Sequence, residues 1–388
     1  MFFAYSDLHN PDVINSLKTS FSKLQIENLS VVAVLTGGAE EKFLKAFREG
    51  KLSPPIAILA HESQNSLPAA AEIMAYLHHR DIPSRLFLIP EEAKDVENAN
   101  RLAGLLKYLD GKEIGLLDEP SPWLISASTL TPYDLHSNWG LSVRRITWKE
   151  FLEKYEEDLS EDELSDFKNK ISGAEKLLVS EEEIIKQVKM YKALKYIHDK
   201  YNLLGLSVKC FHLLNILNTV PCLAFSVLNS EENYVLGCEG DIPALIGMII
   251  SKHLTGKSGF MANLNWFYEG NKVLMSHCTS PIGLLEKFYI PTHFESGKGA
   301  AVKGYYPKGT IVSLVKILPS GKLWFSKGVI VDTPEKGNIC RTQVVIETDE
   351  ETYKDLRSGV LGNHTVIVPE DITDVLDHIY WLATWLRE

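Results

Sequence analysis

Short apolar runs alternate with helix-like stretches along the first 110 residues. The apolar runs cover residues 31–35, 56–59 and 86–89, and polar or turn-forming residues follow them at 36–38, 61–62 and 90. Between the last two runs, residues 67–79 have the composition of a helix that carries Pro68 in its first turn. Short continuous apolar strands separated by helices are typical of a parallel sheet covered on both faces. We therefore predict an N-terminal α/β domain over residues 1–110.

The same alternation resumes after residue 111 and then changes character. Strand-like runs at 114–117, 141–146 and 206–211, with a helix from about 180 to 202, predict a second α/β domain over residues 111–235. Beyond about residue 255, glycine-separated apolar runs predict an antiparallel barrel or sandwich. We therefore predict a β-rich domain over residues 236–388, closed by a helix from Asp371 to Leu386.

Composition and charge exclude some classes of partner. The chain of 388 residues has a formal net charge of −11, which argues against a duplex nucleic-acid partner because such partners favour a basic face. No apolar run approaches the roughly 20 residues that span a bilayer. The first residues lack the basic region of a signal peptide. We expect a cytoplasmic protein without a membrane partner.

The five cysteines, at 210, 222, 238, 278 and 340, are odd in number and form no CxxC pair. A disulfide framework is not expected in a chain of this length, and a CxxC-type zinc site is absent. Free cysteine is among the most buried residue types. We expect these five residues to be thiols of the hydrophobic core.

The candidate chemistry starts with two carboxylates, Glu239 and Asp241, that stand two positions apart between an apolar segment and a helix-like run. Asp241 is a favoured type of helix N-cap. It also follows a strand of the α/β pattern, where crevices bind ligands. Glu239 either takes part in chemistry directly or supports the site through hydrogen bonds. His277 and His364 follow much later in the chain, so we expect a metal or acid/base site assembled from several elements.

Several segments together resemble the superfamily of L-fucose isomerase and L-arabinose isomerase, in particular its fucose-isomerase-like branch. The resemblance covers roughly residues 110–388. It is carried by EPSPWL at 119–124, VKCF at 208–211, PCLA at 221–224, LN at 228–229, CEGD at 238–241, FMAN at 260–263, HCT at 277–279, THFESG at 292–297 and GNH at 362–364.

The resemblance implies a fold, a reaction and a cofactor. The implied fold is two Rossmann-like α/β domains followed by a β-rich, barrel-like C-terminal domain. The implied activity is aldose–ketose isomerisation through a cis-enediol, with a divalent metal ion, usually Mn²⁺, holding two sugar oxygens. Motif matching assigns Asp241 as a metal-binding carboxylate and His364 as a histidine ligand, a donor set that suits Mn²⁺. Relatives assemble as homo-oligomers, so a trimer or hexamer is expected. Residues 61–62 and 65–66 would then form a loop that contributes to the active site of a neighbouring subunit.

The chain departs from the family pattern at one position. Relatives are expected to carry an acid where this chain has His212, and no Asp or Glu occurs between Lys209 and Asn229. His212 is therefore a candidate third ligand and, because a neutral imidazole is a base near pH 7, a candidate catalytic base beside Asp241 and Glu239. The alternative function is a non-catalytic sugar-binding or regulatory protein on the same scaffold.

Four further residues are candidates for contact with the sugar. Lys209 either neutralises enediolate charge or forms a salt bridge with Glu239. His277 supports the site. His293 and Glu295 stand in a glycine-containing loop that we expect to face the sugar. Trp123 and Trp266 are expected in the core rather than as stacking platforms for a sugar.

Overall fold

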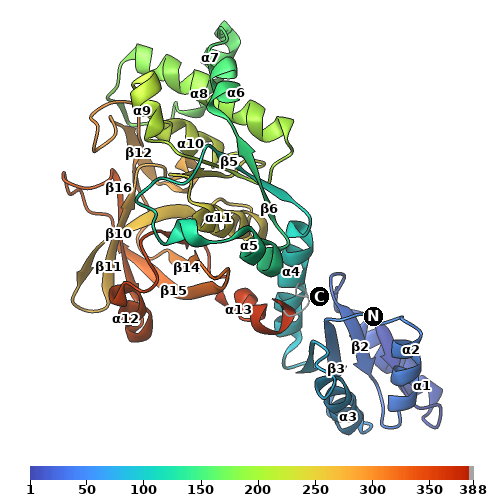
Figure 1. The fold of residues 1–388 in the computed structure, drawn as a ribbon. Coiled ribbons are helices and arrows are strands. Elements are labelled where there is room, and N and C mark those ends of the chain that lie inside the picture. The colour runs from blue at the N-terminus through green and yellow to red at the C-terminus, as the bar shows by residue number, and fades with distance from the viewer. Residues whose placement is uncertain (384–388) are drawn as a thin grey trace. The chain divides into compact units, whose positions relative to one another are not determined.

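A computed structural model describes residues 1–383 and divides the chain into two compact units. One unit holds residues 1–110 together with the chain from Asp374, and the other holds residues 111–373. Parallel sheets and a closed antiparallel barrel make this a mixed α/β protein, as predicted (Figure 1).

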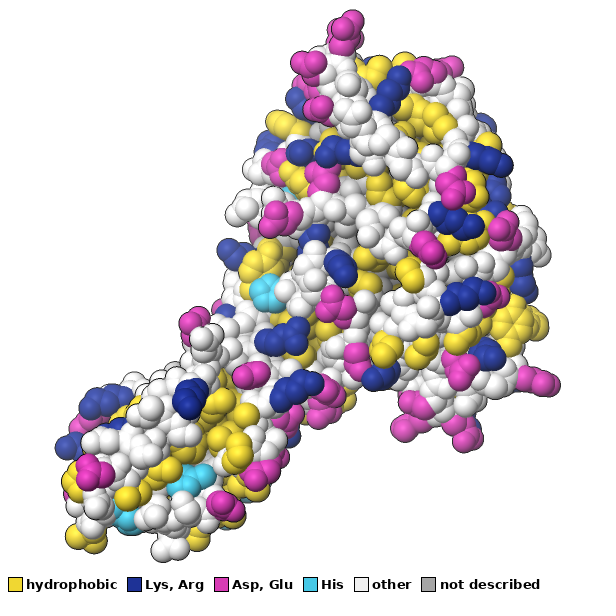
Figure 2. All heavy atoms as spheres, turned by 180° about the vertical axis from the view of Figure 1, so that it is seen from behind, with side chains coloured by type: hydrophobic (Ala, Val, Ile, Leu, Met, Phe, Trp, Pro, Cys, Tyr) yellow, Lys and Arg dark blue, Asp and Glu magenta, His cyan; other side chains and the backbone are white. Residues whose placement is uncertain are grey.

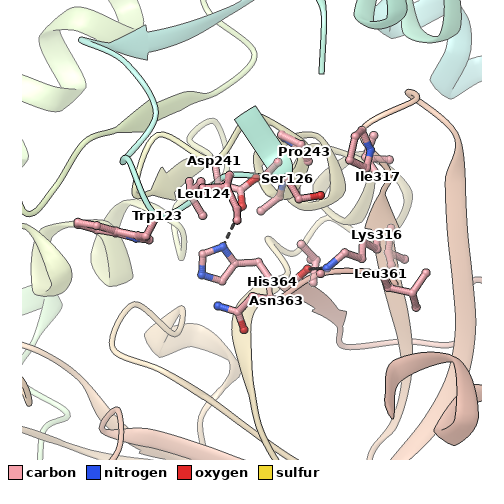
Figure 3. A pocket seen from close by; sticks show the side chains of 17 residues that line it. Trp123, Leu124, Ser126, Asp241, Pro243, Lys316, Ile317, Leu361, Asn363 and His364 are labelled. Carbon is pink, nitrogen blue, oxygen red and sulfur yellow. Dashed lines mark hydrogen bonds and ion pairs between the residues drawn. The ribbon is translucent and has the colours of Figure 1, made fainter. Parts of the chain in front are cut away.

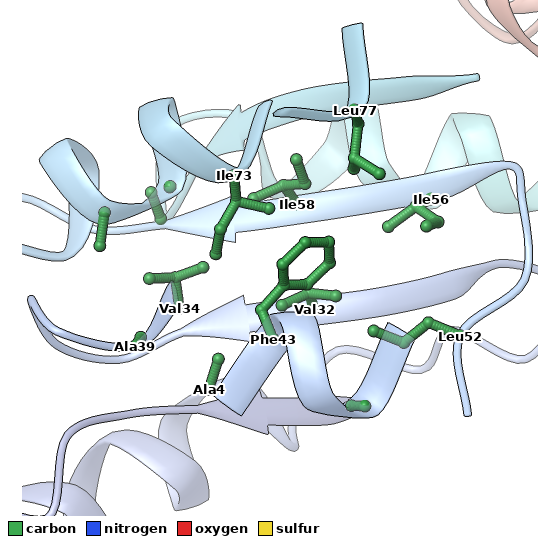
Figure 4. Packing of buried hydrophobic residues seen from close by; sticks show 14 residues of the cluster. Ala4, Val32, Val34, Ala39, Phe43, Leu52, Ile56, Ile58, Ile73 and Leu77 are labelled. Atoms are coloured by element: carbon green, nitrogen blue, oxygen red, sulfur yellow. The ribbon is translucent and has the colours of Figure 1, made fainter. Parts of the chain in front are cut away.

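The first unit is built on a parallel sheet of four strands in the order β1-β2-β3-β4. Its core forms where helices α2 and α3 pack on the sheet: Phe43 and Ile73 meet Val32 and Ile58, all nearly inaccessible to solvent (Figure 4). The strands are β1 (Phe2–Ala4), β2 (Ser30–Val34), β3 (Ile56–Ala60) and β4 (Ser84–Leu88). The helices are α1 (Pro11–Phe21), α2 (Glu40–Arg48), α3 (Ser66–His78) and α4 (Ala93–Leu109).

A second parallel sheet, in the order β6-β5-β8-β9, opens the other unit. Its last strand, β9, pairs with β8 in a register that sets Cys238 opposite Val208, so this sheet extends past residue 235 to Cys238. The strands are β5 (Glu113–Leu117), β6 (Ser142–Ile146), β8 (Leu206–Val208) and β9 (Leu236–Cys238). The helices are η1 (Ala127–Thr129), α5 (Pro132–Trp139), α6 (Trp148–Tyr155), α7 (Glu161–Lys170), α8 (Glu181–Lys200), α9 (His212–Leu217), α10 (Cys222–Leu228) and α11 (Ile242–Thr255).

Six antiparallel strands then close into a barrel in the order β10-β11-β16-β15-β14-β17. Residues such as Phe260, Leu314 and Ile346 fill its interior. The strands are β10 (Phe260–Tyr268), β11 (Lys272–His277), β14 (Ile311–Ile317), β15 (Leu323–Asp332), β16 (Thr342–Thr348) and β17 (Thr365–Val368), and α12 (Glu350–Ser358) follows β16. A smaller sheet has the order β13-β12-β7, from β7 (Lys176–Leu177), β12 (Lys287–Ile290) and β13 (Lys303–Tyr305), with η2 (Ile282–Leu284) before β12.

Helix α11 connects the second sheet to the barrel. A Cβ atom on its Gly247 would lie 2.9 Å from a side-chain carbon of Val366, so the helix backbone lies directly on β17. Asp241 caps the N-terminus of α11, and His364 immediately precedes β17. This packing brings together two residues that are far apart in the sequence.

The predicted terminal helix is wrong in its length. The chain forms two short helices instead, α13 (Thr373–Leu376) and α14 (Ile379–Leu382). The expected apolar stripe of Val375, Ile379 and Leu382 is buried, whereas Leu386 lies outside the described residues. From Asp374 the chain belongs to the unit of residues 1–110, although we had assigned it to the β-rich domain.

Charged side chains of both signs are interspersed on the face shown in Figure 2. Among residues 1–383, no helix combines the length and the apolar composition that crossing a bilayer requires.

Candidate metal centre

The site begins at a strained turn between β9 and α11. Glu239 has a φ of +64° and Gly240 a φ of +73°, a left-handed conformation that is uncommon for a glutamate. Two backbone hydrogen bonds hold the turn: Gly240 donates to the carbonyl of Val208 at 2.9 Å, and Ser121 donates to the carbonyl of Glu239 at 2.8 Å. Non-glycine residues held in this conformation cluster at functional sites.

Asp241 uses its two carboxylate oxygens for two different contacts. One oxygen accepts a hydrogen bond from the backbone of Ala244 at 2.8 Å, as expected of a helix N-cap. The other lies 2.8 Å from Nδ1 of His364, a residue 123 positions later (Figure 3). The two side chains therefore converge, as predicted, but they meet as hydrogen-bond partners.

His364 presents its other ring nitrogen to an acidic group. Its Nε2 is buried and has no hydrogen-bond partner among the described residues. This atom lies 3.8 Å from Oε1 of Glu239, and Nε2 of His277 lies 3.8 Å from the same oxygen. A proton on Nδ1, donated to Asp241, leaves the lone pair of Nε2 available to bind a metal ion. An unpartnered buried nitrogen of this kind fits a metal ligand.

Three side chains form a group that could hold a metal ion: Glu239, His277 and His364. All three are buried, and their ligand atoms lie within 4.8 Å of one another. His277 is fixed through Nδ1, which lies 2.8 Å from the hydroxyl of Thr279. Two histidines and one carboxylate are typical of catalytic sites that leave coordination positions open for substrate or water.

The charges in the group couple metal binding to the release of a proton. Burial alone would raise the pKa of Glu239, but the contact with His277, the charge of His364 and the indole of Trp123 lower that pKa to about 2. The pKa of His364 is raised despite its burial, because the carboxylates of Asp241 and Glu239 stabilise its protonated form. Glu239 is therefore an anion at neutral pH, and a metal ion bound here would displace a proton from His364.

The group differs from the set predicted from the motifs, which was Asp241, His364 and His212. Glu239 and His277 supply ligand atoms in place of the other two. Asp241 contacts Nδ1 of His364 and so orients its ring, instead of offering a ligand atom itself. His212 opens α9, where its ring packs on Trp148 with the ring centroids 5.0 Å apart. The sequence could not show that the end of β11 delivers His277 to the turn at Glu239.

A pocket of about 320 Å³ lies beside the group. Asp241, His364, Asn363, Trp123 and Lys316 are among its lining residues (Figure 3). Trp123 was expected in the core, but 51% of its surface is exposed, and its indole N–H donates to Glu239. Trp266 is likewise exposed, at 61%. Trp123 lies in the segment between β5 and η1, and Trp266 lies within β10.

Sequence reasoning missed Lys316, which lies on the wall of this pocket. Its ammonium group donates to the backbone carbonyl of His364. Burial lowers the pKa of Lys316 to about 8, and the nearby charge of Asp241 only partly opposes that effect. The signal was a single lysine within the otherwise apolar end of a strand, between Val315 and Ile317.

The other candidate residues have different surroundings. Lys209 forms ion pairs with Glu119 at 2.7 Å and with Asp118 at 3.7 Å, so among the described residues its carboxylate partners are these two rather than Glu239. His293 lies with Nδ1 at 3.1 Å from the hydroxyl of Ser296. His293 and Glu295 line a small cavity together with Glu239 and His277.

A scan against protein-family models finds no match, and a search of curated proteins finds none.

Proposed function

We propose that this protein is a metal-dependent enzyme that interconverts an aldose and a ketose through a cis-enediol. The observation that carries the proposal is the buried Glu239–His277–His364 group, in which Nε2 of His364 has no hydrogen-bond partner among the described residues. The choice of a sugar as substrate rests on the resemblance to the fucose-isomerase-like branch. The adjacent pocket of about 320 Å³ lies at the lower end of the range for small-molecule sites.

In this proposal each residue has a separate task. Glu239, His277 and His364 would hold a divalent ion, which we take to be Mn²⁺, and this ion would polarise the substrate oxygens when bound. Asp241 fixes the ring of His364 through Nδ1. Lys316 moves the proton between the two carbons, since an amine with a pKa of about 8 can accept and return a proton near neutral pH.

The wider features of the family belong to the same proposal. The two parallel sheets would correspond to the two Rossmann-like domains of the isomerases, and the barrel to their C-terminal domain. A cytoplasmic location and assembly into a trimer or hexamer are expected on the same grounds.

Metal content and proton exchange test the proposal together. Purified protein is loaded with Mn²⁺ and incubated in D₂O with a panel of aldoses, and NMR follows deuterium incorporation next to the carbonyl. We expect about one Mn²⁺ per chain, lost in Glu239→Gln, and deuterated ketose from at least one aldose. Metal-loaded protein that leaves the whole panel unchanged would remove support for the isomerase.

The role of Lys316 is tested with a matched pair of variants. Lys316→Met should lower turnover by roughly 10²-fold or more, the usual size of a lost acid/base group, while Mn²⁺ binding persists. Lys322 is an exposed lysine directly before β15, and Lys322→Met should leave turnover unchanged. Unchanged turnover in Lys316→Met would place the proton carrier elsewhere.

One observation favours the alternative of a non-catalytic sugar-binding protein. The metal-binding group contains a single carboxylate, and no acid occurs between Lys209 and Asn229, where the family pattern leads us to expect one. A sugar that protects the protein against unfolding, with no deuterium incorporated in the sugar, would support this alternative.

A further inference from the structure

A second pocket, of about 390 Å³, adjoins the pocket beside the metal-binding group. Leu124, Ala127 and Asp241 line both pockets, so these residues form a common wall. All the residues that line the second pocket belong to the unit of residues 111–373. Its volume lies within the range of small-molecule sites, and the proposed function gives it no role.

The second pocket lies at the end of a sheet face that α11 does not cover. Strand pairing places Arg145, Leu116, Ser207 and Gly237 in one row across the sheet β6-β5-β8-β9, and partners in such a row share a face. Helix α11 packs on the Gly237 end of the row, where an added Cβ atom would lie 3.4 Å from Leu245. Leu116 and Arg145, at the other end, line the pocket instead.

The floor of the second pocket is apolar. Aliphatic side chains from the sheet, from α5 and from the segment before it supply most of the lining, among them Leu116, Leu130, Leu135, Leu141 and Val143. Leu130 and Val143 are only partly buried, so some of this hydrocarbon surface is in contact with water. A ligand with an apolar body would remove that surface from water, which is favourable.

The charged groups around the floor are either basic or already engaged. Arg145 is exposed and forms no ion pair with any described residue, and the imidazole of His136 also lines the pocket. Asp241 is the single acid among the described lining residues. Its two carboxylate oxygens contact the backbone N–H of Ala244 and the ring of His364. The pocket therefore offers an unpaired guanidinium beside an apolar floor, and a guanidinium binds a carboxylate through two parallel hydrogen bonds.

We propose that this pocket binds a small organic acid that has an apolar body and one carboxylate. The body lies on the aliphatic floor, and the carboxylate pairs with Arg145. A sugar fits this lining poorly, because its hydroxyl groups would lose water without gaining enough polar partners. The inference does not rest on the isomerase proposal, since Glu239, His277 and His364 are not among the described residues that line this pocket.

Isothermal titration calorimetry of the full chain with straight-chain acids tests the proposal. Acetate, hexanoate and octanoate are the probes, and octanamide is the uncharged analogue of the longest acid. We expect octanoate to bind, with an affinity that rises roughly fourfold for each methylene group added from hexanoate onward, the usual gain from burying that group. Acetate should not bind measurably. Octanamide should bind roughly tenfold more weakly than octanoate, because it lacks the charge-assisted hydrogen bonds.

Three variants show whether the acid binds in this pocket. Arg145→Met should weaken octanoate binding by roughly tenfold and remove its advantage over octanamide. Arg144→Met is the matched control: Arg144 lies on the opposite face of β6 and pairs with Glu113 at 2.8 Å, so losing the same charge there should leave binding unchanged. Ser128 is exposed on the rim, and Ser128→Trp should fill the pocket and block both octanoate and octanamide.

Glu239→Gln separates this inference from the proposed function. The variant should lose Mn²⁺ and keep the wild-type affinity for octanoate, whereas loss of both would place the acid in the metal-bearing pocket and overturn the inference. Failure of octanoate to bind the wild type would also overturn it, as would equal affinities for octanoate and octanamide or unchanged binding in Arg145→Met. Thermal melting shows whether each variant is folded. If Arg145→Met is not, Arg145→Lys, which keeps the charge but loses the paired hydrogen bonds, takes its place and should bind octanoate more weakly than the wild type.

Discussion

At the scale of single residues, Asp241 shows how one carboxylate can serve folding and binding at once. One oxygen caps α11 and the other orients His364. Asparagine keeps a cap acceptor but lacks the negative charge that holds the imidazole. We therefore expect Asp241→Asn to weaken Mn²⁺ binding by about 10- to 100-fold, the usual cost of losing a partner behind a ligand, with little change in stability.

The comparison with Asp241→Ala separates the two tasks. Alanine removes the helix cap as well, which costs about 1 kcal/mol, and it leaves the buried Nδ1 of His364 without its hydrogen-bond partner. The free energy of unfolding should therefore fall further in Asp241→Ala than in Asp241→Asn. Urea unfolding in a chelator measures stability, and Mn²⁺ titration measures affinity. Wild-type affinity in Asp241→Asn would show that Asp241 does not orient a metal ligand.

Lys316 gives a prediction about the pH dependence of stability. Its pKa is about 8 in the folded protein, below the ordinary value of 10.5, because burial disfavours the charged form. Between these two values the unfolded chain binds more protons, so the free energy of unfolding rises with pH. The difference between these two pKa values corresponds to a change of about 3 kcal/mol in the free energy of unfolding, at ~1.4 kcal/mol for each pKa unit.

The matched variant isolates this effect from other titrating groups. In the metal-free protein, the stability of the wild type relative to Lys316→Met should increase between pH 7 and pH 10, as followed by urea unfolding. A constant difference across that range would mean that the lysine is not desolvated in the folded state.

Sequence reasoning found part of the site because some residues carry local signals. Asp241 was recognised from its place between a strand and a helix, and Glu239 from its position two residues before. His277 was underrated as a supporting residue, and Lys316 was missed. Their positions depend on how β11 and β14 pack in the barrel, and no local pattern specifies that packing.

At the scale of elements, the turn that carries Glu239 tolerates very little change. A Cβ atom on Gly240 would lie 2.7 Å from the carbonyl oxygen of Glu119 and 2.8 Å from Cα of Pro120. Both neighbours are backbone atoms, which cannot rotate away, and the positive φ adds strain. We expect Gly240→Ala to destabilise the protein by more than about 2 kcal/mol, through strain and overpacking together, and to weaken Mn²⁺ binding by shifting Glu239.

Gly256 provides a control at the other end of the same helix. It has a nearly identical φ of +74°, but a Cβ atom there would meet nothing within 4 Å. Gly256→Ala should therefore cost only the strain of the conformation, about 1–2 kcal/mol, and leave metal binding intact. Equal losses of stability in the two variants, measured by urea unfolding, would show that the contact with residues 119–120 is unimportant.

Periodicity predicted the elements better than it predicted their partners. The alternation of apolar runs and helices predicted both parallel sheets but not the strand β1, and the glycine-separated runs predicted most strands of the barrel but not β10. The pattern could not distinguish a barrel from a sandwich, since both present alternating faces. The stripe in residues 371–386 predicted burial correctly for Val375 and Leu382, but not the break between α13 and α14.

At the scale of the whole molecule, the metal-binding group and its pocket lie entirely within the unit of residues 111–373. The unit of residues 1–110 contributes no residue to either. It does carry a loop after β3, in which Glu62 and Asn65 are exposed and Gln64 and Asn65 have positive φ values. This loop follows the carboxyl end of a parallel strand, the place where α/β sheets bind ligands.

Under the proposed isomerase function, we expect this loop to complete the site of a neighbouring subunit. We expect light scattering to give the mass of a trimer or hexamer. We also expect the loop variant Glu62→Ala/Asn65→Ala and the site variant Glu239→Gln each to be inactive alone. When the two are co-expressed, some mixed sites combine an intact loop from one subunit with an intact metal group from the other, so part of the activity returns. A monomer at micromolar concentration, or no recovery in a verified mixed oligomer, would show that each chain works without its neighbour's loop.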